Sequence, residues 1–364
     1  MREFRGMGID FTKVKRVLIY RLGSLGDTVV VLPALHLVAR TFPDARRVML
    51  TNLPVHTKAP ISSSIIGQSG LIDDYMAYPK GTRSFRILAG LCWHIRRFRP
   101  EVLVYLTRPR GENTVMRDAR FFRLCGVKRI VGLPVGDRAI NLQLSETQWE
   151  SEAARIVRSV SELGEIDLND PASWDLKFTP AEIDRAEAVL QPCGGKPIIA
   201  CGPGTKVQAK DWGTEKWCAL ISKLARKFPG HCLLLVGAAE ERDTCDRIAA
   251  HWTDRVVNLC GDLSPRETAA VLRKAELFVG PDSGPMHLAA AGGVPCVIAF
   301  AARTKPGIWF PNGTTHRVLY NNVDCAGCDL ETCIEQKKKC LASITVDDML
   351  AASVEAWRGQ STFA

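Results

Sequence analysis

Short apolar runs alternate with segments of helical periodicity along most of this 364-residue chain. The first run, Val17–Tyr20, has the length of a buried strand, and a turn at Gly23–Gly26 follows it. From about Asp27 to Arg40 the apolar residues recur at helical spacing, which predicts a helix. Further apolar runs predict strands at 47–50, 101–105 and 130–132. This alternation is typical of parallel α/β layers.

The same alternation restarts in the second half, after a less periodic stretch at Leu163–Lys177 that predicts a linker. Thr179 is a candidate N-cap for a helix that begins near Pro180. Apolar runs then predict strands at 197–201, 232–236, 277–279 and 297–300, with helices at 214–227 and 265–274 between them. We therefore expect an α/β protein of two doubly wound domains, 1–172 and 173–345, that face a central cleft. A last amphipathic helix within 346–364 is expected to pack back on the first domain.

Composition agrees with this division and adds a charge signal. With 46% hydrophobic residues the chain can bury two cores, and 24% charged residues are ordinary for a globular protein. The formal net charge of +9 favours an acidic partner: a phosphorylated substrate, nucleic acid or an anionic membrane surface. Part of the excess lies in a basic cluster between Arg96 and Arg129, which also fits a solvated surface.

The N-terminal sixteen residues carry basic side chains and no apolar core, unlike a secretion signal. No apolar run reaches the length of a membrane span. We therefore expect a cytoplasmic protein.

The loop Arg21–Asp27 follows the first predicted strand, at the position where ligands bind in doubly wound sheets. Its two glycines let the backbone turn sharply and let a ligand approach closely. Asp27 stands at the expected start of the helix. It is therefore either an N-cap or a catalytic carboxylate that the helix N-terminus keeps ionised, and the two roles are compatible.

A second loop, Gly202–Trp212, combines small residues with groups that bind phosphate. Its backbone N–H groups and the Thr205 hydroxyl can donate hydrogen bonds, and Lys206 and Lys210 supply positive charge. The composition predicts a phosphate or diphosphate site. The alternative is a surface loop with solvated lysines.

A third loop runs from the predicted strand end at Val279 into a helix of small residues. The turn Asp282-Ser283-Gly284 leaves several N–H groups unpaired at the helix start, which favours an anion. His287 lies one turn into this helix and is either a ligand-binding or a structural histidine.

In this order, the three loops resemble those of the bacterial lipopolysaccharide heptosyltransferases, glycosyltransferase family nine. The resemblance is carried by Arg16–Leu35, Gly202–Trp217, Gly237–Glu241 and Val279–Gly293, which span both halves of the chain. It implies a GT-B fold of two Rossmann-like domains, in which the first binds mainly the acceptor and the second mainly the nucleotide sugar. It also implies an enzyme that transfers heptose from ADP-heptose to the lipopolysaccharide inner core, with inversion and without a catalytic metal.

The resemblance also implies roles for individual residues, with Asp27 as the base that deprotonates the acceptor hydroxyl. The implied donor-binding residues are Thr205, Lys206, Lys210, Glu240, Glu241, Leu263, Asp282, Ser283, Gly284 and His287. Of these, Glu240 or Glu241 holds the ribose and Leu263 lies near the adenine. The candidate acceptor-binding residues are Gly23, Ser24, Arg108, Arg117 and Arg120. The segment Lys58–Gly70, on the acceptor side, carries no motif that identifies the acceptor.

The implied partners are a nucleotide diphosphate sugar and a phosphorylated, lipid-linked saccharide. Such an acceptor is compatible with peripheral association at the inner face of the inner membrane. Two other functions stay open: a related transferase with another nucleotide sugar or a protein acceptor, and a non-catalytic nucleotide-binding protein. Nucleic-acid binding is disfavoured because the basic residues fall within an α/β scaffold.

Thirteen cysteines is a high number for a cytoplasmic chain. Those in apolar contexts, such as Cys201 and Cys232, are expected to be buried and reduced. Four others form a short polar cluster: Cys325, Cys328, Cys333 and Cys340. Their spacing suits a structural zinc or iron site with no catalytic role. The alternatives are reduced thiols or disulfides formed after purification.

Overall fold

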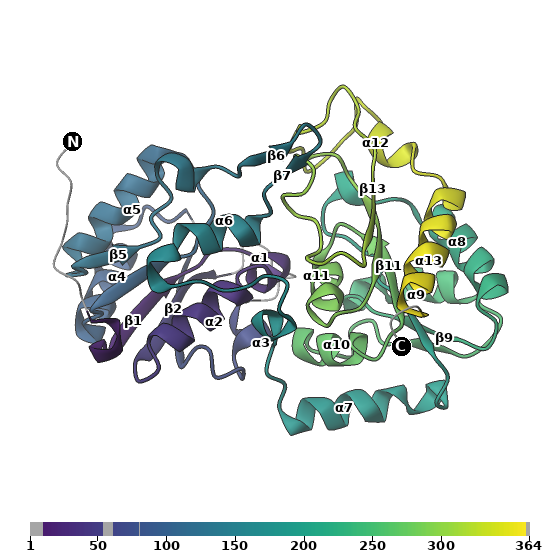
Figure 1. Ribbon diagram of the computed structural model, residues 1–364, viewed down its shortest axis with the longest axis horizontal. Coiled ribbons are helices and arrows are strands. Elements are labelled where there is room, and N and C mark those ends of the chain that lie inside the picture. Colours follow the sequence, from purple (N-terminus) through teal and green to yellow (C-terminus); the bar gives the residue numbers. More distant parts are fainter. Residues whose placement is uncertain (1–9, 54–60, 80, 362–364) are drawn as a thin grey trace. The chain divides into compact units, whose positions relative to one another are not determined.

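The computed structural model describes residues 10–53, 61–79 and 81–361, which form two compact units (Figure 1). The first unit contains the residues up to Ile140 and Ala153–Asp167, and the second contains Asn141–Glu152 and the chain from Leu168 onward. The expectations for residues 1–9 and for part of 58–70 lie outside the described ranges. No helix within those ranges combines the length and apolarity needed to cross a bilayer.

The first unit is built on a five-stranded parallel sheet in the order β3-β2-β1-β4-β5. Its strands are β1 (Arg16–Tyr20), β2 (Arg46–Leu53), β3 (Asp74–Pro79), β4 (Val102–Tyr105) and β5 (Arg129–Val131). Its helices are α1 (Leu25–Val29), α2 (Leu32–Thr41), α3 (Ser63–Ile66), α4 (Phe85–Phe98), α5 (Glu112–Leu124) and α6 (Glu152–Ser159). Four of the five strands were predicted, and β3 was not.

The single helix expected from Asp27 to Arg40 is two helices in the structure, α1 and α2. Pro33 lies at the start of α2, where its missing N–H costs nothing. In a continuous helix its ring would clash with the carbonyl of Val29, so the proline enforces the break.

The second unit is built on a six-stranded parallel sheet in the order β10-β9-β8-β11-β12-β13. The strands are β8 (Ile198–Cys201), β9 (Cys232–Leu235), β10 (Val256–Asn258), β11 (Leu277–Pro281), β12 (Cys296–Phe300) and β13 (Arg317–Tyr320). The helices are α7 (Pro180–Leu190), α8 (Thr214–Lys227), α9 (Arg242–Ala249), α10 (Pro265–Leu272), α11 (Gly284–Ala291), α12 (Lys339–Ala342) and α13 (Val346–Ser361). The predicted cap of α7 is confirmed, because the Glu182 N–H donates to Thr179 Oγ1 at 3.3 Å.

A short hairpin explains why the boundary between the units differs from the predicted split after residue 172. Its strands, β6 (Gln143–Ser145) and β7 (Gln148–Trp149), are antiparallel. The Trp149 N–H donates to the Pro306 carbonyl at 3.0 Å, and the Glu152 N–H donates to the Ile308 carbonyl at 2.8 Å. These hydrogen bonds attach the hairpin to the second unit, although the chain on both sides of it belongs to the first.

The C-terminal helix α13 lies in the second unit, whereas the sequence-based expectation placed it on the first domain. Its residues Met349 and Ala356 are buried in the core that α8 and the second sheet share. Trp357 Nε1 donates to Glu276 at 3.0 Å, and Lys223 of α8 pairs with Asp347. The apolar stripe that made the helix recognisable therefore faces its own unit.

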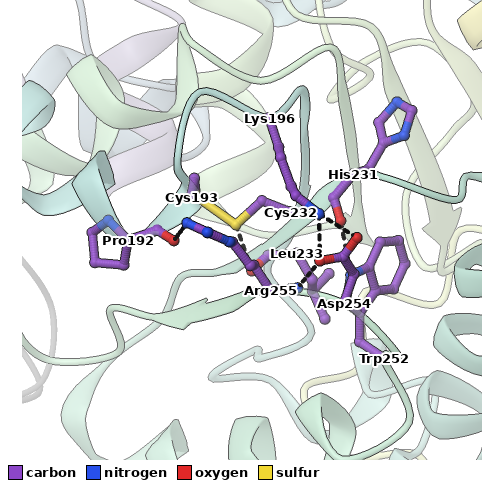
Figure 2. The surroundings of a disulfide bond; sticks show 9 residues. All are labelled: Pro192, Cys193, Lys196, His231, Cys232, Leu233, Trp252, Asp254 and Arg255. Atoms are coloured by element: carbon purple, nitrogen blue, oxygen red, sulfur yellow. Dashed lines mark hydrogen bonds and ion pairs between the residues drawn. A yellow bond between two sulfur atoms is a disulfide. The ribbon is translucent and has the colours of Figure 1, made fainter.

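The expectation that Cys232 is a reduced thiol is wrong. A disulfide joins it to Cys193 and links β9 to the chain after α7 (Figure 2). The two cysteines are 39 residues apart, and their spacing gives no sign of the pairing. Lys196 pairs with Asp254 beside the bridge at 2.5 Å (Figure 2). The remaining cysteines are free thiols.

Candidate active site

The strand order of each sheet fixes where a ligand would bind. In the first sheet, β2 and β3 lie on one side of β1, whereas β4 and β5 lie on the other. In the second sheet, β9 and β10 lie on one side of β8, whereas β11 and the strands after it lie on the other. Ligands in such sheets bind outside the carboxyl ends of the strands at this switch point. The loops after β1 and β4 carry Asp27 and Arg108, so two candidate residues lie at the first switch point.

Asp27 is held by the turn that precedes it. Its Oδ2 accepts hydrogen bonds from the Ser24 N–H at 2.9 Å and from the Ser24 hydroxyl at 3.0 Å. The N-cap of α1 is Ser24, and Asp27 lies three residues further on, so Asp27 is not the N-cap. Gly23 has φ +148°, and a Cβ there would overlap the Asp27 side chain. The glycine therefore gives the carboxylate room to fold back over the turn.

Arg21 is the residue that sequence reasoning missed at this site. Its side chain is fully buried, and its Nη1 donates to the Leu106 carbonyl at 2.6 Å. Its Nη2 donates to the backbone carbonyl of Asp27 and lies 3.6 Å from Asp27 Oδ1. A buried guanidinium thus fixes both the backbone and the charge of the loop, while the Asp27 side chain keeps 22% of its surface exposed. A carboxylate with a cationic partner and access to solvent can accept a proton from a bound hydroxyl.

Beside this loop, a buried polar network connects three tyrosines. The Tyr20 and Tyr78 hydroxyls are 2.7 Å apart, and the Tyr105 hydroxyl donates to Asp118 at 3.0 Å. Arg110 pairs with Asp118 and donates to the Tyr20 oxygen at 3.2 Å. Burial raises the pKa of Tyr20 well above its usual range, so these phenols stay neutral hydrogen-bond donors.

The network anchors the loop after β4, which carries the exposed candidate Arg108. Thr107 Oγ1 accepts a hydrogen bond from the Leu22 N–H at 3.2 Å, which joins this loop to the Asp27 loop. Arg117 and Arg120 are also exposed and lie on α5, where Arg117 Nη2 is 3.4 Å from Asp118 Oδ1 of the same network. Arg108 directly follows Thr107 and is therefore the candidate arginine next to the hydrogen bond that joins the two loops.

In the second unit, the two predicted donor loops meet in an ion pair. Lys210, from the loop after β8, lies 2.8 Å from Asp282, from the loop after β11, and the Asp282 side chain is only 5% exposed. Thr205 Oγ1 accepts from the Val207 N–H at 3.3 Å and shapes the first loop. Lys206 is exposed on the surface of this loop.

Helix α11 begins at this ion pair, with Ser283 as its N-cap. The Ser283 hydroxyl is buried and has no hydrogen-bond partner among the described residues. A buried, unsatisfied hydroxyl at a helix N-terminus is costly unless a ligand satisfies it. Gly284 is the first residue of the helix, and His287 is buried one turn further along, 6.5 Å from the Trp309 ring.

The two glutamates that are candidates for binding the ribose differ in their surroundings in the loop after β9. Glu241 accepts from the Ala238 N–H at 2.8 Å, and its carboxylate lies where side chains on Gly204 and Gly237 would otherwise be. Glu240 is exposed. Leu263 is half-buried directly before α10. Of the two glutamates, Glu241 is therefore the one that the structure holds against the first donor loop.

The predicted metal site has no support in the structure. No group of three or more His, Cys, Asp or Glu side chains within the described ranges is placed to hold a metal ion. Cys325 and Cys333 are close enough to Cys340 that their charge adds to burial in raising its pKa. These three thiols therefore lie near one another, but they are not placed to hold a metal ion.

A cavity of about 360 Å³ in the second unit lies away from the donor loops. It is lined by Trp174, Phe178 and Arg273 and by the C-terminal end of α11. Because Ser283 is at the opposite end of that helix, this cavity is separate from the predicted donor site.

The sheet order and the glycine-rich loops place both units in the Rossmann-like class of nucleotide-binding folds. A family model described as glycosyltransferase family 9 (heptosyltransferase) matches residues 116–339. The chain belongs to this family, as the loops predicted.

Relatives agree with this assignment, and solved structures agree with the fold. Lipooligosaccharide heptosyltransferase 2 of Campylobacter jejuni is 26% identical over 164 residues, which cover 43% of this chain and 50% of that protein. The chain thus spans about half the length of the curated relatives it matches. The family 9 glycosyl transferase of Veillonella parvula superposes with a TM-score of 0.72 at 16% identity, covering 98% of this chain and 100% of that one. E. coli ADP-heptose lps heptosyltransferase II gives 0.67 at 15% identity, covering 95% and 99%. The predicted GT-B fold is confirmed.

Proposed function

We propose that this protein is an inverting glycosyltransferase that moves heptose from ADP-heptose to a hydroxyl of a lipopolysaccharide inner-core acceptor. Family membership and the names of the relatives support heptose transfer, and the ADP-heptose in the name of the E. coli neighbour supports the donor. The observation that carries the proposal is the unpartnered Ser283 hydroxyl beside the Lys210–Asp282 pair. These groups suit the diphosphate of a nucleotide sugar.

In the proposed mechanism, Asp27 takes the proton of the acceptor hydroxyl as that oxygen attacks the anomeric carbon. The bond between this carbon and the diphosphate oxygen breaks on the opposite face, and its electron pair leaves with ADP. The proton passes from Asp27 to solvent. Lys210, Ser283 and the N–H groups of α11 meet the charge that develops on the leaving diphosphate. Asp282 orients the Lys210 ammonium group.

We assign the ribose to Glu241 rather than Glu240. The Ala238 N–H fixes the Glu241 carboxylate against the glycines of the neighbouring loops, and a fixed carboxylate can accept both ribose hydroxyls. We further propose that Leu263 contacts the adenine and that Arg108 binds an acidic group of the acceptor. A lipid-linked acceptor would bring the enzyme to the cytoplasmic face of the inner membrane.

A thermal-shift series with ADP, UDP and GDP tests the donor assignment on the full chain. ADP is expected to raise the melting temperature most, and the E241Q variant is expected to lose most of this gain while E240Q keeps it. Preference for UDP or GDP would indicate a transferase with another nucleotide sugar. Stabilisation by ADP without turnover of ADP-heptose on any lipopolysaccharide core acceptor would point to a binding protein or to another acceptor.

A further inference from the structure

Helix α4 presents large apolar side chains to solvent on its outer face. Its inner face packs in the core of the first unit through the buried Leu91 and Ile95. On the outer face, Phe85 is 83% exposed and Trp93 is 56% exposed. The two are eight residues apart, so they lie on one side of the helix, about 12 Å apart. Exposed aromatic side chains that share a helix face are typical of an interaction surface.

Arginines accompany these aromatic residues. Arg86 and Arg97 are exposed on the same face, and the Arg97 guanidinium lies 5.5 Å from the centre of the Trp93 ring. Arg96 donates to the Leu124 carbonyl at 2.7 Å, which holds α4 beside the end of α5 (Figure 1). Leu124, at that end of α5, is itself 69% exposed.

The excess positive charge of the protein falls in the segment 81–129, which contains α4, β4, α5 and β5. Residues 81–129 contain twelve lysines and arginines against three acidic residues, a local excess of nine. The formal net charge of the whole chain is also +9, so the rest of the chain is balanced. Of the three acidic residues, Glu101 pairs with Arg16, and Asp118 pairs with Arg110. The exposed surface therefore carries a strong positive potential.

We propose that the outer face of α4 docks the protein on an anionic lipid bilayer. The helix would lie in the plane of the interface, with Phe85 and Trp93 inserted among the headgroups. Arg86 and Arg97 would bind lipid phosphates. Tryptophan and phenylalanine suit this interface because they are apolar and rigid, and arginine reaches phosphate with its long side chain while its stem stays in the apolar layer. The match between the arginines and anionic headgroups selects a lipid surface.

Docking on a bilayer would bring the protein to a lipid-linked acceptor, and in this respect the proposal rests on the proposed function. Binding to vesicles needs neither donor nor acceptor. If ADP fails to stabilise the protein but vesicles bind it through α4, the docking proposal survives alone. If ADP stabilises the protein and vesicles do not bind it, docking is wrong and the proposed function stands.

Sedimentation of the full chain with two kinds of vesicle tests the proposal: phosphatidylcholine alone, and phosphatidylcholine with an equal part of phosphatidylglycerol. The wild-type protein is expected to bind the anionic vesicles and to be released by salt. The variant F85A/W93A is expected to bind at least ~10-fold more weakly because it loses most of two inserted side chains. The variant R86Q/R97Q is expected to lose about 5-fold per arginine.

Matched controls lie in the second unit. L144A removes a side chain that is 62% exposed, and R226Q/K227Q removes two charges from the exposed side of α8. Both are expected to bind vesicles as the wild type does. Because Phe85 and Trp93 are exposed, F85A/W93A should melt at the wild-type temperature and keep its stabilisation by ADP.

Quenching of tryptophan fluorescence by brominated lipid distinguishes insertion of Trp93 from a loss of folding. Brominated chains are expected to quench wild-type tryptophan fluorescence, and W93F is expected to remove most of that quenching although seven other tryptophans remain. Equal binding of both vesicle types, or equal losses in F85A/W93A and L144A, would overturn the proposal. So would self-association of the wild type that F85A/W93A abolishes, because the face would then bind a second copy of the chain.

Discussion

The sheets of the two units follow the same strand order except that the second has one more strand at its edge, yet their switch points are built from different groups. At the first, long side chains bind one another: Arg21 holds Asp27, and Arg110 holds Asp118. At the second, short residues and backbone groups are gathered around one ion pair, and the Ser283 hydroxyl has no partner among the described residues. The charged groups of the first site are thus already paired with one another. The second has hydrogen-bonding capacity that a ligand can use.

The largest effect we expect from this comparison is on turnover in the first unit. D27N keeps the size of the side chain and an oxygen that can accept from Ser24, but it removes the base. Turnover of ADP-heptose is expected to fall by about 10²–10⁴-fold, and stabilisation by ADP should be unchanged. D137N, at an exposed position of the same unit, is the control and should turn over normally. Unchanged turnover in D27N would show that Asp27 only stabilises its turn.

A second prediction tests how much Arg21 contributes to stability at the first switch point. R21M leaves the Leu106 and Asp27 carbonyls and the Asp27 carboxylate without their buried donor. Breaking a buried pair of this kind is expected to lower the free energy of unfolding by about 3–5 kcal/mol, measured by denaturant unfolding. R108M, at an exposed position, should change it by less than about 0.5 kcal/mol. A small loss in R21M would mean that the network is not what holds the loop.

This contrast also explains what the sequence could predict. The loops to which we assign the donor were recognisable in the sequence, because their glycine, threonine and lysine residues stand together within each loop. Arg21 and the tyrosine network were not found, because each also depends on a residue far along the chain. Arg21 binds the Leu106 carbonyl 85 residues away, and Tyr20 contacts Tyr78 58 residues away. Strands of the sheet centre were predicted from continuous apolar runs, whereas edge strands such as β3 and β13 are half-exposed and lack them.

The disulfide gives the second unit a covalent link that the described part of the first unit lacks, and it offers a third test. C193S/C232S is expected to lose about 2–4 kcal/mol of unfolding free energy relative to the oxidised protein. Reducing agent should bring the wild type to the same value, and C328S, an exposed thiol, should have no effect. Thiol titration of the denatured, unreduced protein should find eleven free thiols of thirteen. Thirteen would show that the bridge does not form.

The smallest effect tests the hydrogen-bonding capacity assigned to the second switch point, because it compares two serine N-caps of the same unit. Ser264 accepts a hydrogen bond from the Glu267 N–H at 3.2 Å, so S264A should cost about 1 kcal/mol of stability and leave ADP binding unchanged. Ser283 has no such bond, so S283A should not lower the stability of the protein without ADP. If its hydroxyl is kept for a diphosphate, S283A should weaken ADP binding by about 1.5–3 kcal/mol, the usual worth of a hydrogen bond to a charged group. Calorimetric titration with ADP measures this loss. If S283A instead behaves like S264A, the Ser283 hydroxyl is an ordinary cap, and the diphosphate must be bound by the Lys210 ammonium group and the N–H groups of α11.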